Sequence, residues 1–267
     1  MRQDRPSFTA QRVAAQRARL DRPSTSDGNP DAERRLYEGL GNPLLFTRID
    51  SGRMRRRTEW FDRATLEAVN GGVQQIVIVG AGYDGRALRF QHDGVRWIEV
   101  DHPATQADKR RRVEELGVPL AHITFVAVDL IHDDLDTALD AAGHRADDPS
   151  LFICEGLLGY LPMATILSLL RVLRDRATPD SRLAANFRET TPPRWLGDRV
   201  ARGVVDGILE LVGETRLTVL GEGDPERLLS ETGWEIDRQD LSDHTRLDGG
   251  SRGMLVMARP RTRNDRS

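Results

Sequence analysis

Cysteine is almost absent from this chain of 267 residues, because Cys154 is the only one. A single cysteine forms no disulfide within the chain and does not build a cysteine-rich metal site. Long apolar runs are also absent, since no stretch reaches the roughly 18 residues of a membrane span. The amino-terminal stretch has no apolar signal core. We therefore expect a cytoplasmic protein without a structural zinc or a membrane partner.

The chain also lacks an excess of charge of one sign. It has 39 basic and 42 acidic residues, which give a net charge of −3. All basic residues are arginines except Lys109. The densest basic run, Arg53 to Arg57, has no interleaved aromatic residues, so we expect no nucleic-acid partner. No histidine pair has a metal-ligand spacing and no Gly-x-Ser-x-Gly motif occurs, so we expect neither a metal nor covalent catalysis.

What the sequence does contain is an alternation of strands and helices from residue 75 onward. Gln75 to Val79 includes the run Ile-Val-Ile-Val, which is typical of a strand covered on both faces of a parallel sheet. Further strands are predicted over residues 95–100, 123–128, 151–154, 182–187, 234–241 and 254–259. The loop between the last two is too short for a helical crossover, which predicts antiparallel pairing. The pattern predicts an α/β fold with a doubly wound, mostly parallel, seven-stranded Rossmann-like sheet and an antiparallel final hairpin.

Helix signals fill the intervals between these strands. One helix is bracketed by Pro103 and Gly117, and another by Asp224 and Gly233. A third opens at Pro162, and its apolar residues recur at helical spacing. The stripe consists of Met163, Ile166, Leu167, Leu170 and Leu173.

The chain ends differ in character from this central region. Helical spacing from Phe8 to Leu20 is followed by a loop over residues 21–31 that is rich in Pro, Ser, Asp and Gly. We expect residues 1–58 to form a helical arm or lid, since they are too few and too polar for a separate core. Residues 59–260 would form the main domain, and residues 261–267 a disordered tail.

A glycine turn, Gly80-Ala-Gly82-Tyr-Asp-Gly85, directly follows the first predicted strand. Glycines allow a tight turn and let a ligand approach the backbone. Asp101 ends the second strand, 19 residues beyond Gly82, where a carboxylate can accept both hydroxyls of a ribose. The glycine turn and Asp101 by themselves would fit a dinucleotide cofactor as well as any other nucleotide.

Two more predicted strands are followed by acids, Asp129 and Glu155. Because the carboxyl ends of parallel strands form one ligand crevice, these acids would face the same cleft as the glycine turn. A cleft lined by these carboxylates would repel a pyrophosphate but would suit the sulfonium and ammonium groups of S-adenosylmethionine. Asp129 would accept from the adenine amine, and Glu155 would lie near the methionine end. Arg57 would pair with the methionine carboxylate.

Structural roles for these acids remain open at this point. Asp129 fits a helix N-cap about as well as a ligand contact. Glu155, which precedes a glycine, also fits a solvated turn.

Four ordered motifs resemble the leucine carboxyl methyltransferase family of S-adenosylmethionine-dependent enzymes, which includes bacterial polyketide carboxyl O-methyltransferases. They are Val-Gly-Ala-Gly-Tyr-Asp-Gly-Arg-Ala-Leu-Arg at 79–89, Ile-Glu-Val-Asp-His-Pro at 98–103, Phe-Val-Ala-Val-Asp-Leu at 125–130 and Glu-Gly-Leu-Leu-Gly-Tyr-Leu at 155–161. The similarity covers most of residues 8–190. It implies a class I methyltransferase fold with S-adenosylmethionine as the cofactor.

The resemblance also implies roles for particular residues. It assigns cofactor contacts to Gly80 and Gly82, to Asp101, to the pair Asp129 and Leu130, and to Glu155, with Arg57 on the methionine carboxylate. Arg17 would supply a second cation from the arm. Gly85 departs from the threonine that the family often has, which puts a minor hydroxyl contact in doubt.

The expected activity is methyl transfer to an oxygen, with the carboxylate of a small molecule of secondary-metabolite type as the acceptor. A carboxylate is ionised at neutral pH and needs no general base, so catalysis would come from alignment and from exclusion of water. Tyr160 and Arg188 are the catalytic candidates, with Arg188 as the anchor of an anionic acceptor and Tyr160 as its orienting group. A phenol would need a base, for which His102 is the nearest candidate.

Two other functions remain open at this level. The glycine turn would also serve an NAD(P)-dependent oxidoreductase, and an intact nucleotide pocket would serve a non-catalytic, cofactor-binding partner protein. The sequence identifies neither the acceptor nor the oligomeric state, and residues 188–222 match no motif.

Overall fold

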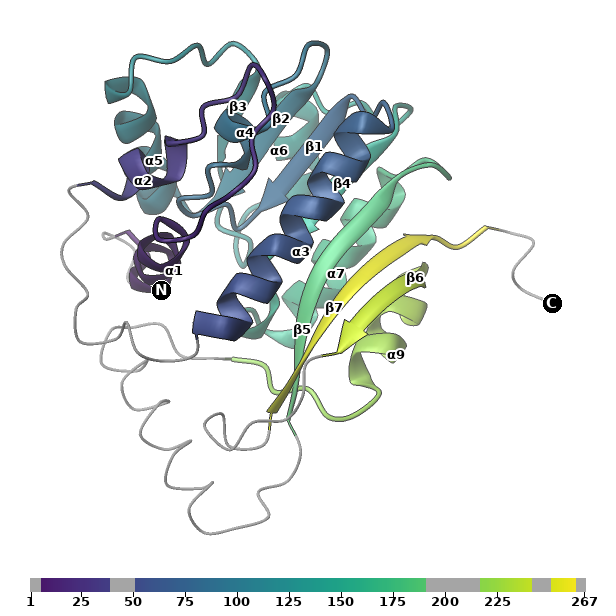
Figure 1. Cartoon of the computed structure of the whole chain (residues 1–267). Coiled ribbons are helices and arrows are strands. Elements are labelled where there is room, and N and C mark those ends of the chain that lie inside the picture. Colours follow the sequence, from purple (N-terminus) through teal and green to yellow (C-terminus); the bar gives the residue numbers. More distant parts are fainter. Residues whose placement is uncertain (1–5, 39–50, 191–216, 242–250, 263–267) are drawn as a thin grey trace, which may run out of the picture.

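A seven-stranded sheet forms the middle layer of the molecule, with strand order β3-β2-β1-β4-β5-β7-β6 (Figure 1). This computed structural model describes residues 6–38, 51–190, 217–241 and 251–262. The strands are β1 (Gln75–Val79), β2 (Arg96–Asp101), β3 (Ile123–Ala127), β4 (Ser150–Cys154), β5 (Arg182–Thr190), β6 (Trp234–Leu241) and β7 (Ser251–Pro260).

The strand directions confirm the predicted architecture. β1 pairs in parallel with both β2 and β4, and the parallel order continues outward to β3 and β5. β7 pairs antiparallel with β5 and with β6. β5 and β7 are longer than predicted because they pair with each other from Leu183 opposite Ala258 to Thr190 opposite Ser251. This mutual pairing satisfies the backbone of polar residues at the end of β5 that strand propensity alone does not favour.

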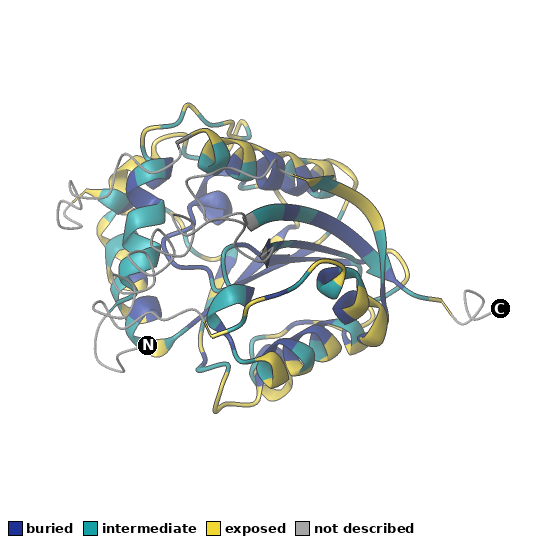
Figure 2. Ribbon diagram, turned by 90° about the horizontal axis from the view of Figure 1, so that it is seen from below, coloured by how far each residue is buried: buried dark blue, intermediate teal, exposed yellow. Residues whose placement is uncertain are grey.

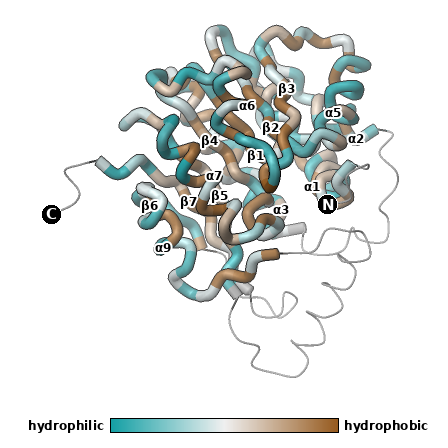
Figure 3. Tube along the Cα trace, turned by 180° about the vertical axis from the view of Figure 1, so that it is seen from behind, coloured by the Kyte–Doolittle hydropathy of each residue, from teal (hydrophilic) through white to brown (hydrophobic). Residues whose placement is uncertain are grey.

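Helices cover both faces of the sheet, as the views from opposite sides show (Figures 1 and 3). They are α1 (Phe8–Arg17), α2 (Ala32–Tyr37), α3 (Ser51–Asn70), α4 (Arg86–Arg89), α5 (Pro103–Glu115), α6 (Leu135–Ala141), α7 (Met163–Asp175) and α9 (Asp224–Glu231). Core residues of α2, α3, α4 and α5 pack on one face, and those of α6, α7 and α9 pack on the other. The central strands β1 and β4 are buried, while the outward helix faces are exposed (Figure 2).

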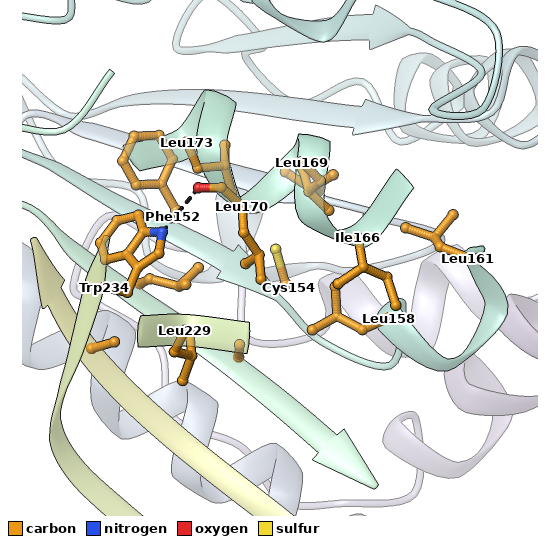
Figure 4. Close-up of a cluster of buried hydrophobic side chains, with 14 of the residues drawn as sticks. Phe152, Cys154, Leu158, Leu161, Ile166, Leu169, Leu170, Leu173, Leu229 and Trp234 are labelled. Carbon is orange, nitrogen blue, oxygen red and sulfur yellow. Dashed lines mark hydrogen bonds between the residues drawn. The ribbon is translucent and has the colours of Figure 1, made fainter. Parts of the chain in front are cut away.

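The core on the α7 face is built around Trp234 and Phe152, whose rings meet edge to face at 6.4 Å (Figure 4). The indole Nε1 of Trp234 donates to the carbonyl oxygen of Leu170 at 2.9 Å, which satisfies its buried polar atom. The predicted stripe on α7 is wrong at Met163, which is 38% exposed. Met163 is the first residue of the helix and lies beyond the sheet contact, and Leu169 is buried in the same cluster instead.

The amino-terminal region contacts the core through short helices. α1 ends at Arg17, three residues before the predicted end at Leu20. The predicted arm boundary at residue 58 lies inside α3, which is one helix from Ser51 to Asn70. Among the described residues, no helix combines the length and apolar character needed to cross a lipid bilayer. The predicted tail lies mostly outside the described residues, which end at 262.

Candidate functional site

A cavity of about 320 Å³ opens at the carboxyl ends of β1, β2, β3 and β4, with α1 forming one wall. Parallel strands end at one edge of a sheet, so residues from four separate motifs meet there. Its lining includes every predicted cofactor residue, namely Arg57, Gly80, Gly82, Asp101, Asp129, Leu130 and Glu155. Tyr160, Arg17 and His102 also line it.

The glycine turn forms the floor of this cavity. Gly80 and Gly82 have φ values of 71° and 50°, a region in which residues with a side chain are strained. A Cβ on Gly80 would lie 2.9 Å from Leu157 Cδ1, and a Cβ on Gly82 would lie 3.0 Å from the Cβ of Ala10. Both positions therefore need glycine for conformation and for space, and α1 packs directly against the turn.

Asp101 ties the glycine turn to the end of β2. Its Oδ2 accepts from the Gly82 amide at 2.6 Å, and its Oδ1 accepts from the His102 amide at 2.7 Å. Burial raises the pKa of Asp101, and these two backbone donors lower it in part. The carboxylate is thus held in one orientation at the cavity wall.

The Asp129 carboxylate accepts hydrogen bonds within the turn that follows β3. It accepts from the Ile131 amide at 3.0 Å, and its Oδ2 lies 3.0 Å from His132 Nδ1 and 3.9 Å from His102 Nε2. Burial raises the pKa of Asp129, but the hydrogen bonds from Ile131 and His132 leave it below its usual value. The helix-cap role falls to another residue, since Asp134 caps α6.

Glu155 is buried at the end of β4 and contacts three arginines. Its Oε1 accepts from Arg57 Nε at 2.9 Å. Its Oε2 lies 2.8 Å from an Arg86 terminal nitrogen and 2.5 Å from one of Arg17. Burial alone would raise the pKa of Glu155, but Arg17, Arg86 and Arg57 lower it to about 2. The side chain is 3% exposed, which rules out the solvated turn.

Arg57 and Arg17 bring positive charge into the cavity from two different helices. Arg57 reaches from α3, and its terminal nitrogens lie 3.6 and 3.7 Å from the position of a Cβ on Gly156. The Gly156 amide in turn donates to Asn186 Oδ1 on β5 at 2.5 Å. Arg17 is buried, and its Nε has no hydrogen-bond partner among the described residues. Its terminal nitrogens pair with Glu155 and Asp84, so Arg17 adds a second buried guanidinium beside Glu155 in the cavity wall.

Sequence reasoning missed the second acid of this cluster, Asp84. Its carboxylate accepts from Arg86 at 2.5 Å and from Arg17 at 3.3 Å. The Lys109 ammonium donates to the Asp84 carbonyl oxygen at 2.7 Å and pairs with Glu99 at 2.5 Å. The available signal was the Asp84-Gly85-Arg86 sequence that follows Tyr83, where two ionisable residues stand within and just after the glycine turn, close to a buried strand.

The two catalytic candidates lie in different places. Tyr160 ends the short 3₁₀ turn Leu158–Tyr160 and lines the cavity. Arg188 lies on β5 opposite Gly253 of β7, and it is not among the described residues that line the cavity. Most of the unassigned region 188–222 lies outside the described residues, which resume at 217.

The rest of the lining is largely apolar. Val13, Ile131, Leu157, Leu161 and Leu217 contribute to the wall. Among the described residues, no group of three or more His, Cys, Asp or Glu side chains is arranged to hold a metal ion. The chemistry available in the cavity therefore comes from carboxylates, guanidinium groups, the phenols of Tyr83 and Tyr160, the imidazoles of His102 and His132, and the backbone of the glycine turn.

Residues 13–174 match the family described as leucine carboxyl methyltransferase. Two relatives from Mycobacteroides abscessus are each named "Putative S-adenosyl-L-methionine-dependent methyltransferase". One is 34% identical over 88% of this chain and 83% of its own length. The other is 36% identical over 68% of this chain. In that match this chain spans 61% of the relative's length, which is less than two thirds.

Solved structures show the same fold at low sequence identity. A structure described as a "putative methyltransferase" from Thermobifida fusca has a TM-score of 0.59 at 14% identity, covering 97% of this chain and 96% of its own. Magnesium protoporphyrin IX methyltransferase from Synechocystis, with bound SAH, has a TM-score of 0.51 at 18% identity, covering 87% and 94%. These similarities confirm the predicted class I methyltransferase fold.

Proposed function

The chain belongs to the leucine carboxyl methyltransferase family, and on that premise we propose that it transfers a methyl group from S-adenosylmethionine to an oxygen of a small molecule. We further propose a carboxylate acceptor of the secondary-metabolite type. The observation that carries the proposal is that carboxylates line one end of the cavity and guanidinium groups line the other.

The two ends match the chemistry of this cofactor. Asp101 and Asp129 supply carboxylate oxygens on the β2 and β3 side, where hydroxyl and amine donors of a nucleoside would bind. Arg57 and Arg17 supply guanidinium donors on the β4 side, where an amino-acid carboxylate would bind. The Arg57 side chain is 22% exposed, so its guanidinium remains accessible to an anionic group at that end.

The proposal gives the lining residues the following contacts. Asp101 would hold the ribose, and Asp129 with Leu130 would contact the adenine. Gly80 and Gly82 would let the ligand approach the backbone of the turn. Glu155 gains a role beyond the sequence-based expectation, because its bond to Arg57 orients the guanidinium.

S-adenosylmethionine, when bound, supplies a methyl group on a sulfonium that reacts by in-line displacement. The contribution of this chain would be alignment and exclusion of water. The apolar residues around the cavity, including Leu157, Leu161 and Leu217, support a dry reaction site. Tyr160 would orient the acceptor oxygen from the same wall. Arg188 stays a predicted anchor for an anionic acceptor, on β5 and outside the described cavity lining.

The oxidoreductase alternative has no support among the comparisons. The relatives and the structural neighbours described above carry methyltransferase names. A non-catalytic, cofactor-binding role predicts the same ligand without turnover, so an activity measurement separates it from the proposal.

Two measurements test the proposed function. Calorimetric titration of the purified chain should show binding of S-adenosylmethionine and S-adenosylhomocysteine, and no binding of NADH. Incubation with isotopically labelled methyl donor and a small-molecule extract of the source organism should give a labelled, base-labile ester together with S-adenosylhomocysteine. Binding of NADH alone would overturn the proposal, and cofactor binding without any labelled product would favour the partner-protein function.

A further inference from the structure

Arg86 is a fully buried arginine that joins three parts of the candidate site. It lies at the start of α4, directly after the glycine turn, and its side chain is 0% exposed. Its Nε donates to Asp62 of α3 at 2.8 Å. One terminal nitrogen donates both to Asp84 at 2.5 Å and to Glu155 at 2.8 Å. Helix α3, the glycine turn and the end of β4 are thus held by one guanidinium.

Arg86 does not line the cavity among the described residues, so it would not touch a ligand. Its influence reaches the cavity through Glu155. Arg86 and Arg17 occupy Oε2 of that carboxylate, which leaves Oε1 for Arg57. The path from Arg86 through Glu155 to Arg57 therefore sets the direction of the guanidinium that faces the cavity.

The chemistry of this position favours arginine over lysine. A guanidinium presents five donors in a planar fork, whereas an ammonium is a point charge with three donors. Arg86 uses this fork to donate to Asp62 and Asp84 together with Glu155, and a further terminal nitrogen lies 3.4 Å from the Thr58 carbonyl oxygen. A lysine would keep the buried positive charge but not this set of directed bonds, so Glu155 would lose one of its three guanidinium contacts and be held less firmly.

We propose that Arg86 is a positioning residue for the amino-acid end of the cofactor: it fixes Glu155 and thereby aims Arg57 at the ligand carboxylate. This inference rests on the proposed function. It predicts that a change at Arg86 weakens ligands that carry the amino-acid group and spares ligands that carry only the nucleoside.

Arg89 provides a matched control one helical turn further along α4. It is equally buried and shares Asp62, at 3.1 Å, and it also donates to the Pro23 carbonyl oxygen. No bond from Arg89 to Glu155 or Asp84 occurs among the described residues. Arg89→Lys therefore disturbs the same buried ion-pair network without touching the path to Arg57.

The experiment compares Arg86→Lys and Arg89→Lys with the wild-type chain by calorimetry, using S-adenosylmethionine and 5′-methylthioadenosine, which lacks the amino-acid group. Arg86→Lys should weaken S-adenosylmethionine by about tenfold or more, as loss of a bond to a charged group does, and change 5′-methylthioadenosine by less than about threefold. Arg89→Lys should not produce this selectivity. If Arg86→Lys yields no folded protein by circular dichroism, Arg86→Gln takes its place, because its shorter side chain also breaks the bond to Glu155 while the direct bond from Arg57 to Glu155 is left in place, and it should show the same selectivity.

Equal losses for the two ligands in Arg86→Lys, or the same selectivity in Arg89→Lys, would overturn the positioning role while leaving the proposed function intact. A wild-type chain that binds 5′-methylthioadenosine as tightly as S-adenosylmethionine would also overturn it. A wild-type chain that binds neither ligand would overturn the proposed function and this inference together.

Discussion

Nε of Arg57 lies 2.9 Å from Oε1 of Glu155, although 98 residues separate them in the sequence. The bond connects α3 to the end of β4, and it places a cation and an anion side by side at one end of the cavity. Because Glu155 also contacts Arg17 and Arg86, guanidinium groups surround it instead of open solvent. The carboxylates predicted at the strand ends therefore do not form a purely acidic cleft, because guanidinium groups lie beside one of them, Glu155.

Removal of Arg57 should discriminate between ligands. Arg57→Ala should weaken S-adenosylmethionine by about 1.5–3 kcal/mol, the range for hydrogen bonds to charged groups, and leave adenosine nearly unchanged. Calorimetry with both ligands measures the difference. Arg56→Ala is the matched control, since the neighbouring Arg56 is exposed and pairs with Asp240 of β6. Equal losses for the two ligands would remove Arg57 from the carboxylate site.

Removal of Asp101 should affect both ligands alike. Asp101→Ala deletes the proposed ribose acceptor and the two bonds that hold the Gly82 and His102 amides. We expect a loss of about 1–3 kcal/mol for S-adenosylmethionine and for adenosine, and a smaller loss for Asp101→Asn, which keeps one acceptor oxygen. Unchanged affinity of Asp101→Ala for adenosine would contradict the ribose assignment.

Glu155 should contribute stability that depends on pH. The pKa of Glu155 is lowered from 4.5 to about 2, because the neighbouring arginines outweigh the effect of burial. Between these values the unfolded chain takes up a proton that the folded chain does not, so the free energy of unfolding decreases as pH falls from about 4.5 to 2. This stabilisation is fully present above that window and amounts to on the order of 3 kcal/mol.

Urea unfolding at pH 6, 4 and 3 measures this effect. The free energy of unfolding of Glu155→Gln should fall less steeply with decreasing pH than that of the wild-type chain. Glu114→Gln is the control, because Glu114 lies in an exposed pair with Arg110. Parallel slopes for wild type and Glu155→Gln would show that the carboxylate does not carry the predicted linkage.

Tyr160 should act on turnover and not on cofactor affinity. With the acceptor identified by the labelling assay, Tyr160→Phe should lower kcat by about tenfold and change cofactor affinity by less than about twofold, since it removes one orienting hydroxyl. Tyr37→Phe serves as the control, because Tyr37 ends α2, packs against Ala14 and Tyr83, and is not among the described cavity residues. An unchanged kcat in Tyr160→Phe would contradict the orienting role of the hydroxyl and leave Tyr160 only as part of the cavity wall.

Much of the acidic half of the site could be predicted from the sequence. Strand periodicity places Asp101, Asp129 and Glu155 at the carboxyl ends of strands, and all such ends share one edge of a parallel sheet. The strand order did not need to be known, because the glycine turn and the acids meet at that edge in any doubly wound arrangement. The seven strands and the antiparallel hairpin followed from the same local patterns.

The arrangement of the positive charges was decided by the tertiary structure. Arg17 and Arg57 were expected from the sequence as cations of the site, but no local pattern among so many arginines showed that Arg86 is buried with them or that all three meet at Glu155. Burial of a guanidinium is tolerated only where carboxylates and carbonyl oxygens from distant segments satisfy it, so its location depends on how α1 and α3 pack on the sheet. For the same reason the sequence could not tell which of Tyr160 and Arg188 lines the cavity: the structure places Tyr160 in its wall, whereas Arg188 lies on β5 and is not among the described lining residues.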